Sequence, residues 1–144
     1  MAEGTAERLH SIALHLLRGL RRQDDALGVG PARLSALSVL LSGPKTMSEL
    51  AEAEQVRLPT MTRIVSGLEG LGLARRVPHP TDRRSVRVEM TGAGAEMIGR
   101  GRALRVERLA RSLQALDAAE LARVEEALDV LERVTLEVLR GPDR

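Results

Sequence analysis

Arginine, threonine and serine side chains gather in one stretch of the chain, from Arg57 to Val88, where they could bind an anion. This stretch holds seven basic and two acidic residues, a net charge of +5. Residues 1–56 have a net charge of −1 and residues 89–144 a net charge of −2, which together leave +2 for the whole chain. Guanidinium groups, hydroxyls and the free N–H groups of a helix start all donate hydrogen bonds to phosphate. One concentrated basic element in a nearly neutral chain therefore indicates a site for a polyanion.

The first half of this stretch is predicted to be a helix that begins near Pro59, since proline is tolerated in a first helical turn. Its buried stripe is expected to be Met61, Ile64, Val65, Leu68 and Leu71. Arg63, Ser66 and Gly70 lie opposite that stripe, with Thr62 beside them. Gly72 is expected to end the helix. A preceding short helix, opened by a capping box of Thr46 and Glu49, would complete a helix-turn-helix.

The second half of the stretch is predicted to be a hairpin with a basic tip. Residues 73–78 and 85–90 read as strands, and the second alternates apolar and polar residues. The turn between them holds Asp82, Arg83 and Arg84. A hairpin that follows a helix-turn-helix in this way is expected to form a wing.

Helices are predicted on both sides of this stretch. Residues 7–22 show one apolar stripe, and 32–41 form a largely apolar helix with Pro31 in its first turn, which we expect to be buried. Thr91 is expected to cap a helix that runs to about residue 116, and a capping box of Asp117 and Glu120 opens a last helix to about residue 139. The last helix is apolar on two flanks, which usually means that it packs on a second partner.

Composition excludes several classes of function. The chain has no cysteine, so disulfides, thiolate catalysis and Cys-ligated zinc are ruled out. It has no Phe, Tyr or Trp, which disfavours the stacking used to bind single strands but not a helix in the major groove of duplex DNA. No apolar run approaches the roughly 20 residues that span a bilayer, and the N-terminus lacks a signal-peptide pattern, so we expect a cytoplasmic protein without membrane partners. The three histidines have no metal-ligand spacing, no catalytic grouping stands out, and we expect no metal, no cofactor and no enzyme activity.

Three segments at these spacings resemble the MarR (multiple-antibiotic-resistance regulator) family of bacterial transcription factors. They are MSELAE at 47–52, PTMTRIVSGLEGLGL at 59–73 and DRRSVRVEMTGAG at 82–94. The resemblance implies a mainly helical α+β fold, a winged helix-turn-helix with long N- and C-terminal dimerisation helices. The chain would be one domain over 1–144, with the winged part at about 32–91 and the dimerisation helices at about 5–24 and 92–140. It would be a homodimeric repressor of nearby genes that binds a pseudo-palindromic operator in double-stranded DNA.

The resemblance also implies roles for individual residues. The helix from Pro59 would enter the major groove, where an arginine can bridge guanine O6 and N7, and the wing arginines would reach the minor groove. Asp82 would hold an arginine in place or simply stabilise the turn. Arg57 stands where a serine cap is usual in the family, so it contacts a phosphate or the helix start is shifted. The predicted DNA-binding residues are Arg57, Thr60, Thr62, Arg63, Ser66, Arg75, Asp82, Arg83, Arg84 and Arg87.

Two further sets of residues follow from the same resemblance. Small aromatic or phenolic anions release many members from DNA, and such an effector would lie near His15, Arg18 and Arg33. The dimer contacts would come from Leu9, Ile12, Leu16, Leu121, Leu128, Leu131 and Val138. Gly67 and Gly70 weaken the helix from Pro59; close approach of another backbone is one explanation, and drift at an exposed position is the one we favour.

Two alternatives to a ligand-released repressor remain open from the sequence. One is a winged-helix regulator that has no ligand. The other is a helical protein-interaction module whose basic hairpin binds an acidic protein.

Overall fold

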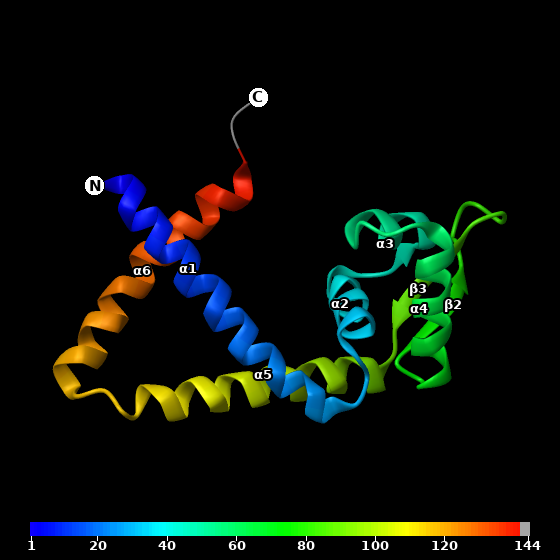
Figure 1. Cartoon of the computed structure of the whole chain (residues 1–144). Helices are drawn as coiled ribbons and strands as arrows, with labels where there is room; N and C mark the ends of the chain where they lie inside the picture. Colours follow the sequence, from blue (N-terminus) through cyan, green and yellow to red (C-terminus); the bar gives the residue numbers. More distant parts are fainter. Residues whose placement is uncertain (142–144) are drawn as a thin grey trace. The chain divides into compact units, whose positions relative to one another are not determined.

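The computed structural model describes residues 1–141 and separates into two compact units, one from Met1 to Val106 and one that begins at Glu107. The first unit holds α1 (Ala2–Arg21), α2 (Pro31–Val39), α3 (Met47–Ala53), α4 (Leu58–Gly70), three strands and the start of α5 (Gly92–Leu113). The second unit holds the end of α5 and α6 (Ala118–Arg140). The mainly helical α+β fold predicted from the sequence is confirmed (Figure 1).

The strands form one antiparallel sheet in the order β1 (Lys45–Thr46), β3 (Val86–Met90), β2 (Ala74–Pro78). β2 and β3 are the predicted hairpin, each one residue shorter at its start than expected. β1 was not predicted, because two residues carry no alternation that could reveal a strand. Its pairing of Lys45 with Val88 ties the segment before α3 to the middle of the sheet.

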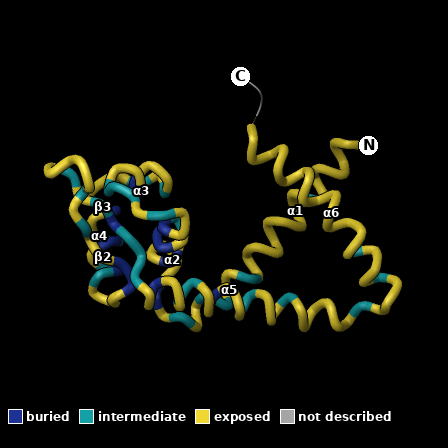
Figure 2. The backbone as a smooth tube through the Cα atoms, turned by 180° about the vertical axis from the view of Figure 1, so that it is seen from behind, coloured by how far each residue is buried: buried dark blue, intermediate teal, exposed yellow. Residues whose placement is uncertain are grey.

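A core of aliphatic side chains joins α2, α3, α4 and the sheet. Its fully buried members are Leu37, Leu50, Met61, Val65, Leu68 and Val88. Figure 2 shows this burial concentrated in the winged part of the first unit. Because each of these elements contributes to one core, the core fixes the position of α4 relative to the hairpin.

The expected helix ends were largely correct. Both capping boxes form, with Glu49 N–H donating to Thr46 Oγ1 at 3.1 Å and Glu120 N–H donating to Asp117 Oδ1 at 2.7 Å. Gly72 has a φ of 70°, as a residue that ends α4 requires. α5 ends at Leu113, three residues before the expected end, and a short 3-10 helix (Arg22–Leu27) follows α1.

Two residues that were predicted to be buried, each at the end of its helix, are exposed. Leu71, the last member of the predicted stripe of α4, is 50% exposed because the helix ends before it. Leu41 is 60% exposed, since the chain leaves α2 as a short 3-10 helix (Leu40–Ser42) and turns this side chain away from the core.

The helices α1 and α6 are each apolar on one side, yet they are not buried. Among the described residues, α1 and α6 contain no buried side chain. Figure 2 shows both helices exposed almost throughout. Each therefore has an apolar face that its own unit leaves uncovered.

Candidate nucleic-acid interface

The outer face of α4 is polar and open because its inner face is anchored in the core. Met61, Val65 and Leu68 are fully buried, which turns Arg63 and Ser66 to solvent. Arg63 forms no ion pair with any of residues 1–141. Its guanidinium is thus available to an external acceptor.

The start of α4 has no side-chain cap. Arg57 occupies the N-cap position in an extended conformation, and its side chain makes no capping hydrogen bond. The helix begins at Leu58, one residue before the expected start. Pro59 has no N–H, and the Thr60 and Met61 N–H groups donate to the Arg57 carbonyl at 3.0 and 3.1 Å. Within the described chain, the Leu58 N–H is therefore the one at this helix start that can donate to an external anion.

The two threonines near this start are in different situations. Thr62 Oγ1 donates to the Leu58 carbonyl at 3.0 Å, so its proton is engaged within the helix while its lone pairs stay open. Thr60 is exposed, and its hydroxyl makes no side-chain hydrogen bond within residues 1–141. Of the two hydroxyls, only that of Thr60 can donate to a phosphate without first breaking a bond to the backbone.

The wing turn is organised by His79, a residue for which the sequence predicted no role. Its Nδ1 accepts from the backbone N–H of Asp82 at 3.1 Å and of Thr81 at 3.3 Å. The Asp82 carboxylate accepts from the backbone N–H of Arg84 at 3.0 Å. Asp82 therefore stabilises the turn through the backbone, the second of its two expected roles, and it forms no ion pair within residues 1–141.

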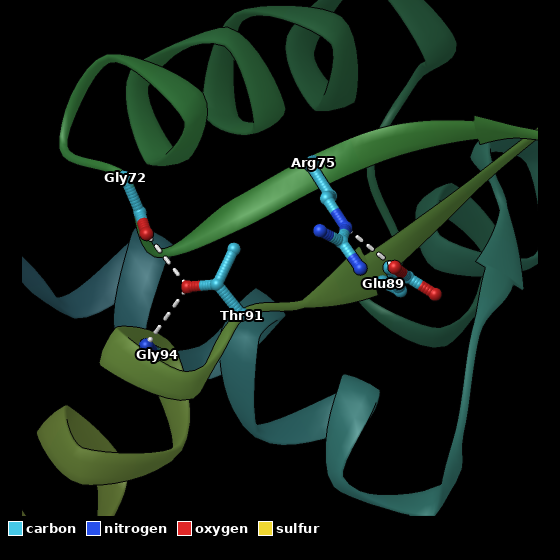
Figure 3. Close-up of polar contacts among 5 residues, drawn as sticks. All are labelled: Gly72, Arg75, Glu89, Thr91 and Gly94. Carbon is cyan, nitrogen blue, oxygen red and sulfur yellow. Dashed lines mark hydrogen bonds and ion pairs between the residues drawn. The ribbon is translucent and has the colours of Figure 1, made fainter.

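The hairpin arginines fall into two groups. Arg75 pairs with Glu89 at 2.5 Å across the β2–β3 ladder, where the two residues lie directly opposite each other (Figure 3). Arg76 pairs with Glu69 of α4 and donates to Ser66 Oγ at 3.3 Å. Arg83 and Arg84 are exposed and have no acidic partner in the described chain. The positive charge that is not neutralised locally thus lies at the wing tip.

Arg87 lies between these groups on the central strand. It is half-buried opposite Thr46 of β1 and Val77 of β2, and its Nε is buried without a hydrogen-bond partner among the described residues. Only the far end of its guanidinium could reach an external phosphate.

The junction behind the wing is tightly packed. Thr91 Oγ1 donates to the Gly72 carbonyl at 2.6 Å and accepts from Gly94 N–H at 3.1 Å, which caps α5 as expected (Figure 3). The Thr91 N–H donates to the Leu73 carbonyl at 3.0 Å. A Cβ at Gly94 would lie 2.2 Å from that carbonyl oxygen, so no other residue fits there without movement of the backbone.

A cavity of about 450 Å³ lies in the first unit, among α1, the 3-10 helix, α2 and the start of α5. Its charged lining is Arg21, Asp24, Asp25 and Arg105, and Arg105 pairs with Asp24. The three predicted ligand residues are not part of the lining. His15 and Arg18 are exposed on α1, about two turns and one turn before the lining residue Arg21. Arg33 lies on α2 with its guanidinium against Gly67 of α4.

The predicted dimer residues lie on the uncovered faces of α1 and α6. Ile12, Leu16, Leu121, Leu128, Leu131 and Val138 are exposed and Leu9 is half-buried. Two other absences hold over residues 1–141: no helix is long and apolar enough to cross a membrane, and no cluster of three His, Asp or Glu residues could hold a metal.

Comparison with known proteins supplies a context for this geometry. The model of the MarR family matches residues 37–86. An HTH-type transcriptional regulator of Mycobacterium bovis is 36% identical over 127 residues, 88% of this chain and 89% of that protein. The HTH-type transcriptional repressor IacR of Pseudomonas putida is 30% identical over 90 residues, 62% of this chain and 54% of that protein. A transcriptional regulator from Thermotoga maritima has the same fold, with a TM-score of 0.86 at 24% identity, over 96% of this chain and 99% of that one.

Proposed function

The chain belongs to the MarR family of transcriptional regulators, and on that premise we propose that it binds a pseudo-palindromic operator as a homodimer and represses nearby genes. That it is a DNA-binding regulator rather than an enzyme follows from its family and its relatives. Repression is supported by the relative from Pseudomonas putida, which is a repressor. The cytoplasm, where bacterial DNA lies, is the proposed location.

The observation that supports this proposal best is the set of arginines without acidic partners around α4 and the wing. Arg63 lies on the outer face of a helix whose inner face is locked in the core, and Arg83 and Arg84 lie at the end of a hairpin attached to the same core. This arrangement suits a major-groove helix and an adjacent minor-groove contact. Arg57, the Thr60 hydroxyl and the Leu58 N–H suit phosphate. Arg75, Ser66 and Arg87 are weaker candidates, because Arg75 and Ser66 are held by internal partners and Arg87 is half-buried.

The homodimer is supported by the two uncovered helices. The apolar residues of α1 and α6 are too many and too regularly spaced for isolated surface residues. A second copy of the chain would cover both faces, and two-fold symmetry would place two copies of α4 about 34 Å apart, one turn of DNA. Residues 1–144 then act as one domain, with the winged part at about 32–91.

A binding experiment tests the DNA part of the proposal. A dye-labelled duplex of the gene's own upstream region and a random duplex are titrated with protein at several salt concentrations, since the chain has no fluorescent aromatic residue. Arg63→Ala is expected to weaken the free energy of operator binding by about 1–3 kcal/mol. It is also expected to reduce the preference of the protein for the operator over random DNA. Arg84→Ala is expected to weaken binding and lower the salt dependence.

Arg140→Ala is the matched control. It also removes one positive charge, but from an exposed ion pair with Glu137 on α6, outside the first unit. The proposal is wrong if the wild-type protein binds no duplex more tightly than random sequence at low salt. In that case a basic hairpin that binds an acidic protein becomes the better explanation.

Release by a small aromatic or phenolic anion is a second, finer part of the proposal. The cavity of about 450 Å³ is within the usual size range for small ligands and is lined by aliphatic side chains of α1, α2 and α5. The cavity lining contains two arginines and two aspartates, so it has no net charge. Because Arg105 already pairs with Asp24, Arg21 is the lining cation best able to bind an anion. A ligand releases DNA only if it prefers a conformation that fits the operator poorly.

Benzoate and 4-hydroxybenzoate are suitable probes, with thermal unfolding followed by circular dichroism. We expect them to raise the melting temperature of the wild type and to weaken operator binding, and Arg21→Ala to remove both effects. Arg22→Ala, which changes an exposed neighbour that does not line the cavity, is the control. A wild type that responds to neither compound, nor to a wider panel of aromatic acids, would favour the regulator without a ligand.

A further inference from the structure

The guanidinium of Arg33, on α2, rests on the backbone of α4 at Gly67. A Cβ built on Gly67 would lie 2.4 Å from Arg33 Nε, 2.7 Å from Nη2 and 2.8 Å from Cζ. Non-bonded contacts of a Cβ atom are almost never shorter than 3.0 Å. The guanidinium therefore occupies the space that a side chain at position 67 would fill. Gly67 therefore leaves room for a side chain from α2, a close approach that the sequence did not reveal.

This contact places the Arg33 guanidinium on the edge of α4 that carries two proposed DNA contacts. Thr60, Arg63 and Gly67 follow one another at spacings of three and four residues, so they form one line along the helix surface. Thr60 and Arg63 are exposed, and the core lies on the other side of the helix. Arg33 thus adds a positive charge from a different helix to the same line, one turn beyond Arg63.

The charge of Arg33 has no partner within the described part of the chain. Its guanidinium makes no ion pair and no hydrogen bond with residues 1–141. Glu54, at the end of α3, accepts from Ser35 of α2, and Glu69 of α4 pairs with Arg76. An exposed guanidinium fixed against a groove-binding helix, with no internal acceptor, suits a phosphate of the strand that borders the groove.

We propose that Arg33 binds a phosphate of the DNA backbone beside α4, and that Gly67 positions its guanidinium by leaving room for it. The inference rests on the proposed DNA-binding function and adds a contact from α2, outside the helix-turn-helix and wing. Arg33 is then a DNA ligand and not an effector ligand. Gly67 is a positioning residue, because it acts through Arg33.

Substitution of Gly67 separates positioning from folding. Alanine is the best helix former and glycine among the worst, so Gly67→Ala favours α4 itself. The new methyl group needs the space of the guanidinium, and a flexible arginine can move away to provide it. The variant is therefore expected to melt at the wild-type temperature or above while it binds DNA more weakly.

The experiment compares wild type, Arg33→Ala, Gly67→Ala and the double variant on labelled operator and random duplexes over a salt series. Arg33→Ala is expected to weaken binding to both duplexes about fivefold or more and to lower the salt slope by about one per protomer, as loss of a phosphate contact requires. Gly67→Ala is expected to weaken binding as well, and to have no additional effect in the Arg33→Ala background. Gly99→Ala on α5, where a Cβ meets no atom within 4 Å, controls for helix stabilisation alone.

The outcomes distinguish this inference from the function on which it rests. If the wild type binds its operator and Arg33→Ala has wild-type affinity and salt slope, Arg33 makes no phosphate contact. If Gly67→Ala weakens binding equally with and without Arg33, the methyl group obstructs DNA directly and Gly67 does not act through Arg33. If the wild type binds no duplex specifically, the proposed function itself fails and this inference fails with it.

Discussion

At the scale of single residues, the arginines of the winged part are of two kinds, those paired with an internal carboxylate and those without such a partner in the described chain. Arg75 and Arg76 neutralise Glu89 and Glu69, whereas Arg63 and Arg84 have no acidic partner in the described chain. The count of arginines could be read from the sequence, but their partners could not. The pair of Arg75 with Glu89 depends on the strand register, and Arg76 reaches α4 only because the core packs that helix on the sheet.

Glu89→Gln is expected to strengthen binding to any duplex, by about threefold to tenfold. The change removes a negative charge from the hairpin that is proposed to face DNA, and it releases Arg75 to bind phosphate. Stability should hardly change, because an exposed ion pair contributes little. Titration of labelled DNA measures the affinity, and Glu126→Gln on α6 is the charge-matched control. Equal affinity of Glu89→Gln and wild type would show that Arg75 does not face DNA.

His79→Ala is expected to weaken DNA binding while the melting temperature stays close to that of the wild type. The substitution removes the acceptor for the Thr81 and Asp82 N–H groups, so the turn that presents Arg83 and Arg84 loses its preferred shape. Anisotropy with labelled operator and circular dichroism provide the two measurements. His79→Asn, whose carbonyl can accept from the same region, should restore part of the affinity. No difference between the alanine and asparagine variants would contradict this role of the ring nitrogen.

At the scale of elements, predictability followed how local each signal is. The capping boxes at Thr46 and Asp117 involve residues three apart, and both form as predicted. β1 exists only because it pairs with β3, and the shape of the wing turn depends on a histidine that also suits many other settings. The contact between Gly67 and the Arg33 guanidinium joins residues 34 positions apart in the chain, so no local sequence pattern could have revealed it.

Gly94→Ala is expected to destabilise the first unit by about 1–3 kcal/mol or more, since its methyl group would overlap the Leu73 carbonyl, which belongs to rigid backbone. Gly92→Ala, two residues earlier in the same helix, meets no atom within 4 Å and should be neutral or slightly stabilising. Denaturant unfolding followed by circular dichroism compares the two variants. Equal stability of both would show that the junction is looser than described.

At the scale of the whole molecule, the winged fold could be predicted from the sequence, whereas the residues that line the cavity of the first unit could not. Periodicity and caps determine a fold of this kind, and the family resemblance adds the order of its elements. The cavity in the first unit is different, because its lining comes from four separate segments. His15 and Arg18 are the predicted ligand residues on α1, whereas Leu17 and Arg21 on the same helix line the cavity. The choice among neighbouring turns depends on helix rotation, which residue type alone does not set.

Leu128→Asp is expected to convert the proposed dimer to monomers and to reduce operator binding by at least tenfold. Leu128 is 50% exposed on the uncovered apolar face of α6, and a carboxylate at a dimer seam would be buried without a partner. Analytical ultracentrifugation measures the assembly and labelled DNA the affinity. Ala122→Asp makes the same charge change at an exposed position on the polar side of α6. A Leu128→Asp protein that still sediments as wild type would exclude this face from the interface.

The junction at Thr91 and Gly94 has a mechanical consequence. Two hydrogen bonds of 3.0 Å or less, from Thr91 to the Gly72 and Leu73 carbonyls, and a contact at Gly94 with no room for a methyl group join the start of α5 to the residues between α4 and β2. Because these contacts leave little room for adjustment, we expect a rotation of the start of α5 to move α4 and the hairpin with it. Slow hydrogen exchange at the Thr91 and Gly94 amides would be its signature in solution.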